Sequence, residues 1–148
     1  MNERQARDLV SMAYSLVQDQ HALRALAVCG SWARGNPRPD SDLDILIVAQ
    51  DVVPWRNEQR WVGGLPFEKA QLAYRSHRTA KYGVAWSAHI CLEPDAELEL
   101  TFVSTSWTCV DPIDPGTRDV VSDAFRIIVD KDGHLARLAA VCARGLPV

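Results

Sequence analysis

The sequence lacks the features that would assign it to a membrane, secreted or nucleic-acid-binding class. No apolar run approaches the ~20 residues that span a bilayer, and the N-terminal stretch has no apolar core typical of a secretory signal. Neither sign of charge dominates, because 16 Lys and Arg stand against 19 Asp and Glu, a net charge of −3. This balance argues against broad electrostatic binding to nucleic acid or anionic lipid. We therefore expect a cytoplasmic protein without a membrane partner.

Cysteine is also sparse, and its spacing excludes the common cysteine-based sites. The four cysteines form no CxxC pair and no Cys/His pattern at zinc spacing, so reduced thiols are expected at Cys29, Cys91, Cys109 and Cys142. The 148 residues are 47% hydrophobic and 24% charged, as in an ordinary folded domain that can bury a core. The sequence predicts a single domain over residues 1–148.

Hydrophobic periodicity predicts helices and strands in alternation. We expect an N-terminal helix over residues 2–18 and a short C-terminal helix over residues 134–143, with further helices at 54–63 and 117–124. Apolar or alternating runs predict strands at 23–29, 43–48, 84–92, 97–103 and 125–129, of which 84–92 and 97–103 form a hairpin. Residues 65–83 give no clear assignment, and the basic stretch within them, Arg75, His77, Arg78 and Lys81, is interpreted as a solvated loop rather than a ligand contact. The predicted fold class is α/β (α+β), with a mixed β-sheet flanked by helices.

The segment that carries chemistry links the first two predicted strands. Gly30 and Ser31 end the first strand, and Asp42 and Asp44 open the second after a loop rich in turn formers. Side chains two positions apart on a strand point to the same face, so both aspartates lie together at the strand's entrance. The apolar residues that follow on the same face place the two carboxylates at the edge of a core.

A second acidic pair, Glu97 and Glu99, lies on a later predicted strand. If the strands are neighbours, one of the two glutamates joins the aspartates in a cluster of three carboxylates. Two like charges ~4 Å apart cost on the order of 4 kcal/mol at an effective dielectric of 20. Such a cluster therefore either retains protons or binds a hard divalent cation, and oxygen ligands favour Mg²⁺ or Mn²⁺.

The turn at Gly30 and Ser31 has the residue types of a phosphate-binding turn. Glycine allows the backbone to approach a ligand closely, and free N–H groups at the start of a following helix bind phosphate. The Ser31 hydroxyl adds a donor, and Arg34 is placed either to contact phosphate or to form a salt bridge with the acidic loop that leads to Asp42. A phosphate-binding turn beside carboxylate-held metals is the equipment for phosphoryl or nucleotidyl transfer.

These motifs resemble the signature of the nucleotidyltransferase superfamily, which includes DNA polymerase beta, kanamycin nucleotidyltransferase and the minimal nucleotidyltransferases. The resemblance is carried by Gly-Ser-x-Ala-Arg-Gly from Gly30, by Ser-Asp-x-Asp ending at Asp44, and by an acidic strand around Glu99. It is strong over residues 26–48, moderate over 84–130 and poor over 55–83.

The resemblance implies a mixed sheet, two bound Mg²⁺ or Mn²⁺ ions and a nucleoside triphosphate substrate, with ATP the first expectation. Asp42, Asp44 and Glu99 would be the catalytic metal ligands, with Glu97 as the alternative third carboxylate. Gly30, Ser31 and Arg34 would bind the nucleotide. The family transfers a nucleoside monophosphate to a hydroxyl and releases pyrophosphate.

Three functions remain open at this stage. The first is a metal-dependent nucleotidyltransferase acting on a hydroxyl of a small molecule or protein, alone or as a homodimer. The second is a minimal nucleotidyltransferase antitoxin that binds, and in some cases adenylylates, a helical RNase toxin. The third is a nucleotide sensor or scaffold without activity, which the presence of all three carboxylates disfavours.

Overall fold

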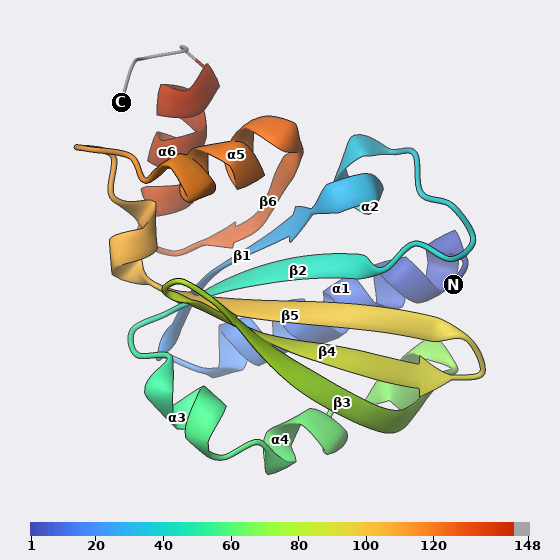
Figure 1. The fold of residues 1–148 in the computed structure, drawn as a ribbon. Coiled ribbons are helices and arrows are strands. Elements are labelled where there is room, and N and C mark those ends of the chain that lie inside the picture. Colours follow the sequence, from blue (N-terminus) through green and yellow to red (C-terminus); the bar gives the residue numbers. More distant parts are fainter. Residues whose placement is uncertain (144–148) are drawn as a thin grey trace.

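The structure, a computed structural model, describes residues 1–143 and is built on one six-stranded sheet (Figure 1). The strands are β1 (Leu23–Cys29), β2 (Leu43–Ala49), β3 (Ala73–Tyr82), β4 (Ala85–Glu93), β5 (Ala96–Ser104) and β6 (Phe125–Asp130). Their order is β3-β4-β5-β2-β1-β6, and β2 is parallel to β5 while every other pairing is antiparallel. The predicted mixed sheet is confirmed.

Helices cover both faces of this sheet. They are α1 (Glu3–Asp19), α2 (Gly30–Arg34), α3 (Val53–Asn57), α4 (Arg60–Gly63), α5 (Pro115–Asp123) and α6 (His134–Ala143), with short 3-10 helices η1 (Phe67–Ala70) and η2 (Thr105–Thr108). No helix within residues 1–143 is long and apolar enough to cross a membrane.

The larger core lies between the sheet and α1. Leu9, Ala13 and Val17 recur every four residues along α1, so they form one buried stripe against the strands. An Asn2 capping box starts the helix: the Asn2 side chain accepts from the Gln5 backbone at 2.8 Å, and the Gln5 side chain accepts from the Asn2 backbone at 3.0 Å. This face of the sheet is apolar across almost its whole width.

The opposite face is only partly covered. There α5 and α6 pack on β1, β2 and β6 through a second core that includes Leu46, Val48, Val121, Leu135 and Leu138. On β4, β5 and the start of β2, the same face carries polar side chains. The candidate site lies on this part of the face, beside the second core.

Residues 53–83 are where the structure adds most to the sequence prediction. The single helix predicted over 54–63 is two short helices, α3 and α4, separated by Glu58 and Gln59. The basic stretch interpreted as a solvated loop, which includes Arg78, belongs instead to β3, an edge strand with mostly exposed side chains. Solvent on both sides of an edge strand removes the alternating apolar pattern by which strands are recognised.

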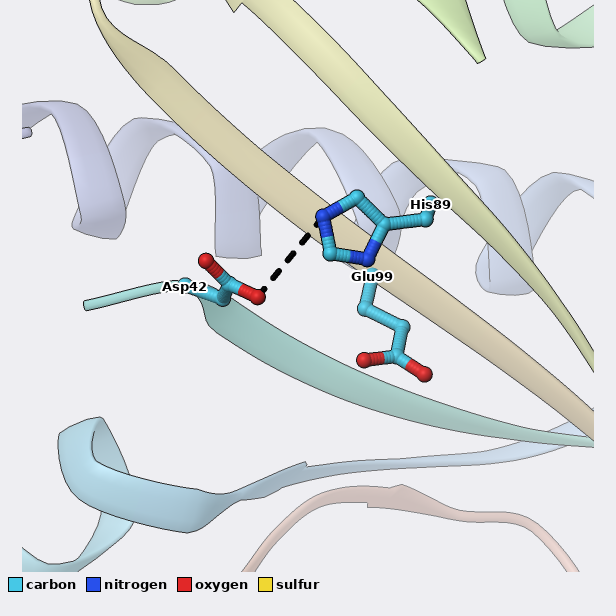
Figure 2. A group of neighbouring side chains, drawn as sticks. All are labelled: Asp42, His89 and Glu99. Carbon is cyan, nitrogen blue, oxygen red and sulfur yellow. Dashed lines mark ion pairs between the residues drawn. The ribbon is translucent and has the colours of Figure 1, made fainter. Parts of the chain in front are cut away.

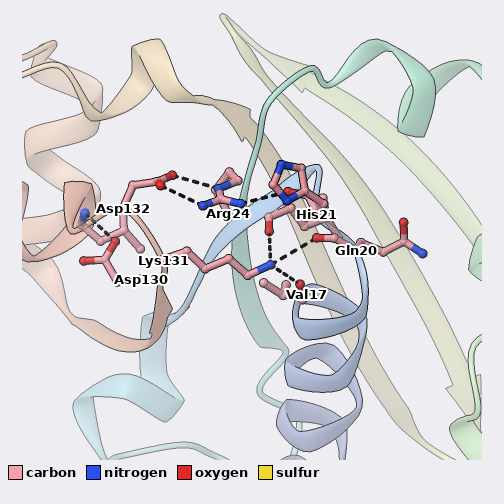
Figure 3. A network of polar contacts seen from close by, with 9 residues as sticks. Val17, Gln20, His21, Arg24, Asp130, Lys131 and Asp132 are labelled. Atoms are coloured by element: carbon pink, nitrogen blue, oxygen red, sulfur yellow. Dashed lines mark hydrogen bonds and ion pairs between the residues drawn. The ribbon is translucent and has the colours of Figure 1, made fainter.

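A polar network fastens the C-terminal part of the chain to α1 and β1 (Figure 3). The Lys131 ammonium donates to the carbonyls of Val17 at 2.7 Å, Gln20 at 3.2 Å and Leu23 at 2.8 Å. It therefore satisfies carbonyls at the end of α1 and in the connection to β1. Beside it, Asp132 accepts two hydrogen bonds from the Arg24 guanidinium, at 2.8 and 3.0 Å.

We expect Lys131→Met to lower the free energy of unfolding by about 2–3 kcal/mol, because carbonyls lose a charge-assisted donor while the aliphatic stem is kept. Urea unfolding followed by circular dichroism measures this loss. The control Lys81→Met changes an exposed lysine on β3 and should stay within about 0.5 kcal/mol of the parent. Equal losses in both variants would contradict a structural role for the Lys131 network.

Candidate active site

The pairing of β2 with β5 places two of the predicted carboxylates side by side. Asp44 is the register partner of Glu99 across the parallel pair, and His89 on β4 is the partner of Glu99 on its other side. Partners in register project to the same face of a sheet, here the partly covered one. Asp42, two residues before Asp44 at the entrance to β2, completes a row of side chains across three neighbouring strands (Figure 2).

The Asp42 carboxyl shares a hydrogen bond with Glu97, and the Asp44 carboxyl shares one with Glu99. The structure therefore brings all four predicted acidic residues into one cluster. Glu99 is the glutamate in register with Asp44, whereas Glu97 is more exposed and contacts Asp42 and His89. Glu99 thus lies between Asp44 and His89 in the sheet.

Burial and the neighbouring negative charges make Asp42 and Asp44 hold protons unusually strongly. Burial, followed by the charges of Glu99 and Asp42, raises the pKa of Asp44 to about 7. Burial and the hydrogen bond with Glu97 raise the pKa of Asp42 to about 6. The same hydrogen bond, with Asp42 donating, lowers the pKa of Glu97. A cluster that retains protons at neutral pH is one that a divalent cation can neutralise, so the residues present fit the metal that the resemblance implies.

Gly30 lies directly against this cluster. Its φ of +69° is in the left-handed region, and a Cβ atom at this position would lie 2.5 Å from Asp44 Oδ2. Glycine is therefore required here both by the backbone conformation and by the closeness of the carboxylate. The turn brings the first residues of α2, including Ser31, beside the aspartates.

A polar cavity of about 350 Å³ opens next to this turn. Its lining combines hydroxyl, amide and guanidinium donors with one carboxylate: Ser31, Arg34, Asn36, Arg38, Asp40 and Ser41. Arg34 also forms an ion pair with Asp123 of α5 at 2.6 Å, so the salt bridge weighed for Arg34 exists, but with α5 rather than with the acidic loop. Both side chains are substantially exposed, so the pair is weak and leaves the guanidinium free to contact a ligand.

One residue of this face, His89, was not predicted from the sequence, and a second, Arg78, was expected in a solvated loop. His89 lies among the carboxylates, and Arg78 on β3 is the register partner of His89 and lowers the pKa of Glu97 through its charge. The signal for His89 was present in the sequence as polar residues at alternate positions, Ser87, His89 and Cys91, within an otherwise apolar strand. Recognising it required knowing that β4 lies beside β5.

Comparison with known protein families tests the resemblance to the nucleotidyltransferase superfamily. Residues 15–78 match the family described as "Nucleotidyltransferase domain". The resemblance to the nucleotidyltransferase superfamily is confirmed. No curated protein matches the chain in sequence.

A solved structure shares the fold of this chain. An aminoglycoside 6-adenyltransferase from Bacillus subtilis matches with a TM-score of 0.51 and 14% identity, over 72% of this chain and 37% of that chain. The present chain thus spans little more than a third of that protein. A toxin-antitoxin structure with AMP-PNP matches with a TM-score of 0.45 and 12% identity, over 95% of this chain and 85% of that chain.

Gly30→Ala tests the packing of the turn against Asp44. We expect it to lower the melting temperature and to weaken divalent-cation binding, because the new methyl group displaces the Asp44 carboxylate. Gly35→Ala is a matched control, since Gly35 has a φ of +79° but no atom within 4 Å of its added Cβ. Both variants carry backbone strain of about 1–3 kcal/mol, so only the loss of cation binding should distinguish them. Equal cation affinities in the two variants would contradict the contact.

The raised pKa values predict that the metal-free protein loses stability as the pH rises. Between about pH 4 and 7 the folded state binds more protons than the unfolded chain, so unfolding becomes easier as Asp42 and Asp44 ionise. Discounted for residual exposure to water, the loss is about 2 kcal/mol, or about 4–8 °C in melting temperature.

Thermal melts in EDTA from pH 5 to pH 8 measure this loss. Asp44→Asn should flatten the pH dependence, while Asp95→Asn, in the exposed turn between β4 and β5, should leave it unchanged. A melting temperature that rises toward pH 8 in the parent protein would contradict the expected sign.

Proposed function

We propose that this protein is a metal-dependent nucleotidyltransferase that transfers a nucleoside monophosphate, AMP first, from a nucleoside triphosphate to a hydroxyl group. The observation that carries the proposal is the convergence of Asp42, Asp44 and Glu99 beside the Gly30 turn. The match of residues 15–78 to the nucleotidyltransferase domain supports it independently.

In this proposal, the turn and the strands contact different parts of the substrate. The cavity lined by Ser31 and Arg34 receives the β- and γ-phosphates, since its hydroxyl and guanidinium donors suit phosphate oxygens. Asp42 and Asp44 hold the cations that neutralise the triphosphate. When bound, divalent cations supply positive charge to the phosphates and ease deprotonation of the attacking hydroxyl.

The acceptor enters from the other side of the aspartates. Since the phosphate cavity lies by β1 and α2, the acceptor hydroxyl lies over β5 and β4, within reach of Glu99. Glu99 then takes the proton as the acceptor oxygen bonds to the α-phosphorus. The bond between the α-phosphorus and its bridging oxygen breaks, and pyrophosphate leaves. Arg78, exposed on the same face, is placed to contact a negatively charged acceptor.

Calorimetric titration of ATP, GTP, CTP and UTP, each with and without Mg²⁺, tests the nucleotide half of the proposal. We expect one triphosphate to bind only in the presence of Mg²⁺, and the double variant Asp42→Asn/Asp44→Asn to lose that binding by at least about 100-fold. Asp95→Asn keeps the same change of charge outside the site and should bind as the parent does.

Labelled transfer then tests the chemistry. Incubation with the α-labelled form of the triphosphate that binds, and with candidate hydroxyl acceptors or a cell extract, should release pyrophosphate and label an acceptor, and Glu99→Gln should abolish the label. Failure of every triphosphate to bind the parent protein, or equal binding to the double variant, would overturn the proposal.

A further inference from the structure

His89 is the one imidazole placed among the carboxylates of the described chain. It projects from β4 toward β2, with its Nε2 atom 3.7 Å from Asp42 Oδ2 and 3.3 Å from Glu97 Oε2 (Figure 2). That nitrogen is buried and makes no well-formed hydrogen bond. A buried polar atom without a well-formed hydrogen bond is unfavourable, so this nitrogen is held where a further partner would stabilise it.

The imidazole forms a compact group of donors with two of the carboxylates. One ligand atom each from Asp42, His89 and Glu99 lies within 4.8 Å of the other two. Donors bonded to one ion at about 2.1 Å lie within about 4.2 Å of one another, so small side-chain rotations would close this group around a cation. These three side chains come from three adjacent strands and converge on one point.

We propose that His89 is a nitrogen ligand of a divalent cation, which makes this centre a mixed set of one imidazole and two carboxylates. The inference deepens the proposed function, because it concerns the same cations, but cation binding can be measured without nucleotide. Asp44, on the far side of Glu99 from His89, belongs to the carboxylate-only part of the site.

A nitrogen ligand changes which metal the site prefers. Mg²⁺ takes oxygen ligands almost exclusively, whereas imidazole suits transition metals such as Co²⁺ and Zn²⁺. The centre should therefore bind Co²⁺ more tightly than Mg²⁺ by a larger factor than an all-carboxylate site does.

The competing interpretation is that His89 only offsets negative charge as a cation beside Asp42 and Glu97. The two roles make opposite predictions. A counter-charge weakens the binding of a second cation, so its removal should strengthen metal binding. A ligand strengthens metal binding, so its removal should weaken it.

Calorimetric titration of Co²⁺ and Mg²⁺ into the metal-free protein, at pH 7.5 and without nucleotide, tests the proposal. We expect His89→Ala to weaken Co²⁺ binding by at least about tenfold and Mg²⁺ binding by less. His89→Gln, which offers a carbonyl oxygen, should restore Mg²⁺ binding more than Co²⁺ binding. The visible absorption of bound Co²⁺ should change in both variants, because it reports the donor atoms directly.

His77→Ala is the matched control, because His77 lies on β3, is the register partner of Ile90, and therefore faces the α1 side of the sheet. It should bind both metals as the parent does, with an unchanged Co²⁺ spectrum. Asp42→Asn should lose Co²⁺ binding, which shows that the titration reports this site.

Co²⁺ binding that is equal or tighter in His89→Ala, or a parent protein that binds no Co²⁺, would overturn the proposal. The proposed function fails on a different measurement. Nucleotide binding lost only in the aspartate double variant would uphold nucleotidyl transfer even if His89 is not a ligand. A His89-dependent Co²⁺ site without nucleotide binding would uphold the ligand and overturn the function.

Discussion

The candidate site depends on the parallel pairing of β2 with β5, which holds Asp44 and Glu99 side by side despite their like charges. Burial and the nearby charge of Glu99 together raise the pKa of Asp44, which reports the cost of this arrangement. Backbone hydrogen bonds and the apolar residues on the reverse face of both strands keep them together. The negative charge of these carboxylates is therefore held at a fixed position in the centre of the sheet.

The remaining features of the site relieve or use this concentrated charge. Gly30 leaves room for the Asp44 carboxylate, and the cavity lined by Ser31 and Arg34 supplies donors on one side. His89 and Arg78 supply nitrogen groups on the other side, from β4 and β3. The arrangement has a direction, with hydroxyl and guanidinium donors by β1 and α2 and an open face over β4 and β5.

The sequence predicted the centre of the fold better than its periphery. Strands that are apolar at all but one position, such as residues 23–29 and 43–48, were recognisable because burial on both faces selects apolar residues along almost the whole strand. Alternation predicted that the acidic side chains of each of two strands share a face. Whether the two pairs meet in one cluster depends on which strands are neighbours, and no local sequence pattern determines that. β3 was not predicted because its side chains are mostly exposed on both faces, so it carries charged residues instead of alternating apolar and polar ones. His89 escaped because its role depends on a cross-strand partner ten residues away.

The placement of β1 has a consequence for the order in which the molecule can be completed. β1 pairs with β2 on one side but with β6, about a hundred residues later, on the other, and Glu99 also follows the segment that carries the family signature. Residues 15–78 contain both aspartates yet lack the third carboxylate and both outer neighbours of the β1–β2 pair. During synthesis, the outer edges of β1 and β2 therefore stay unpaired until β5 and then β6 have been made. Until then, these unpaired edges can form non-native strand pairs. The site can form only once β5 has been made, although its most recognisable residues come early in the chain.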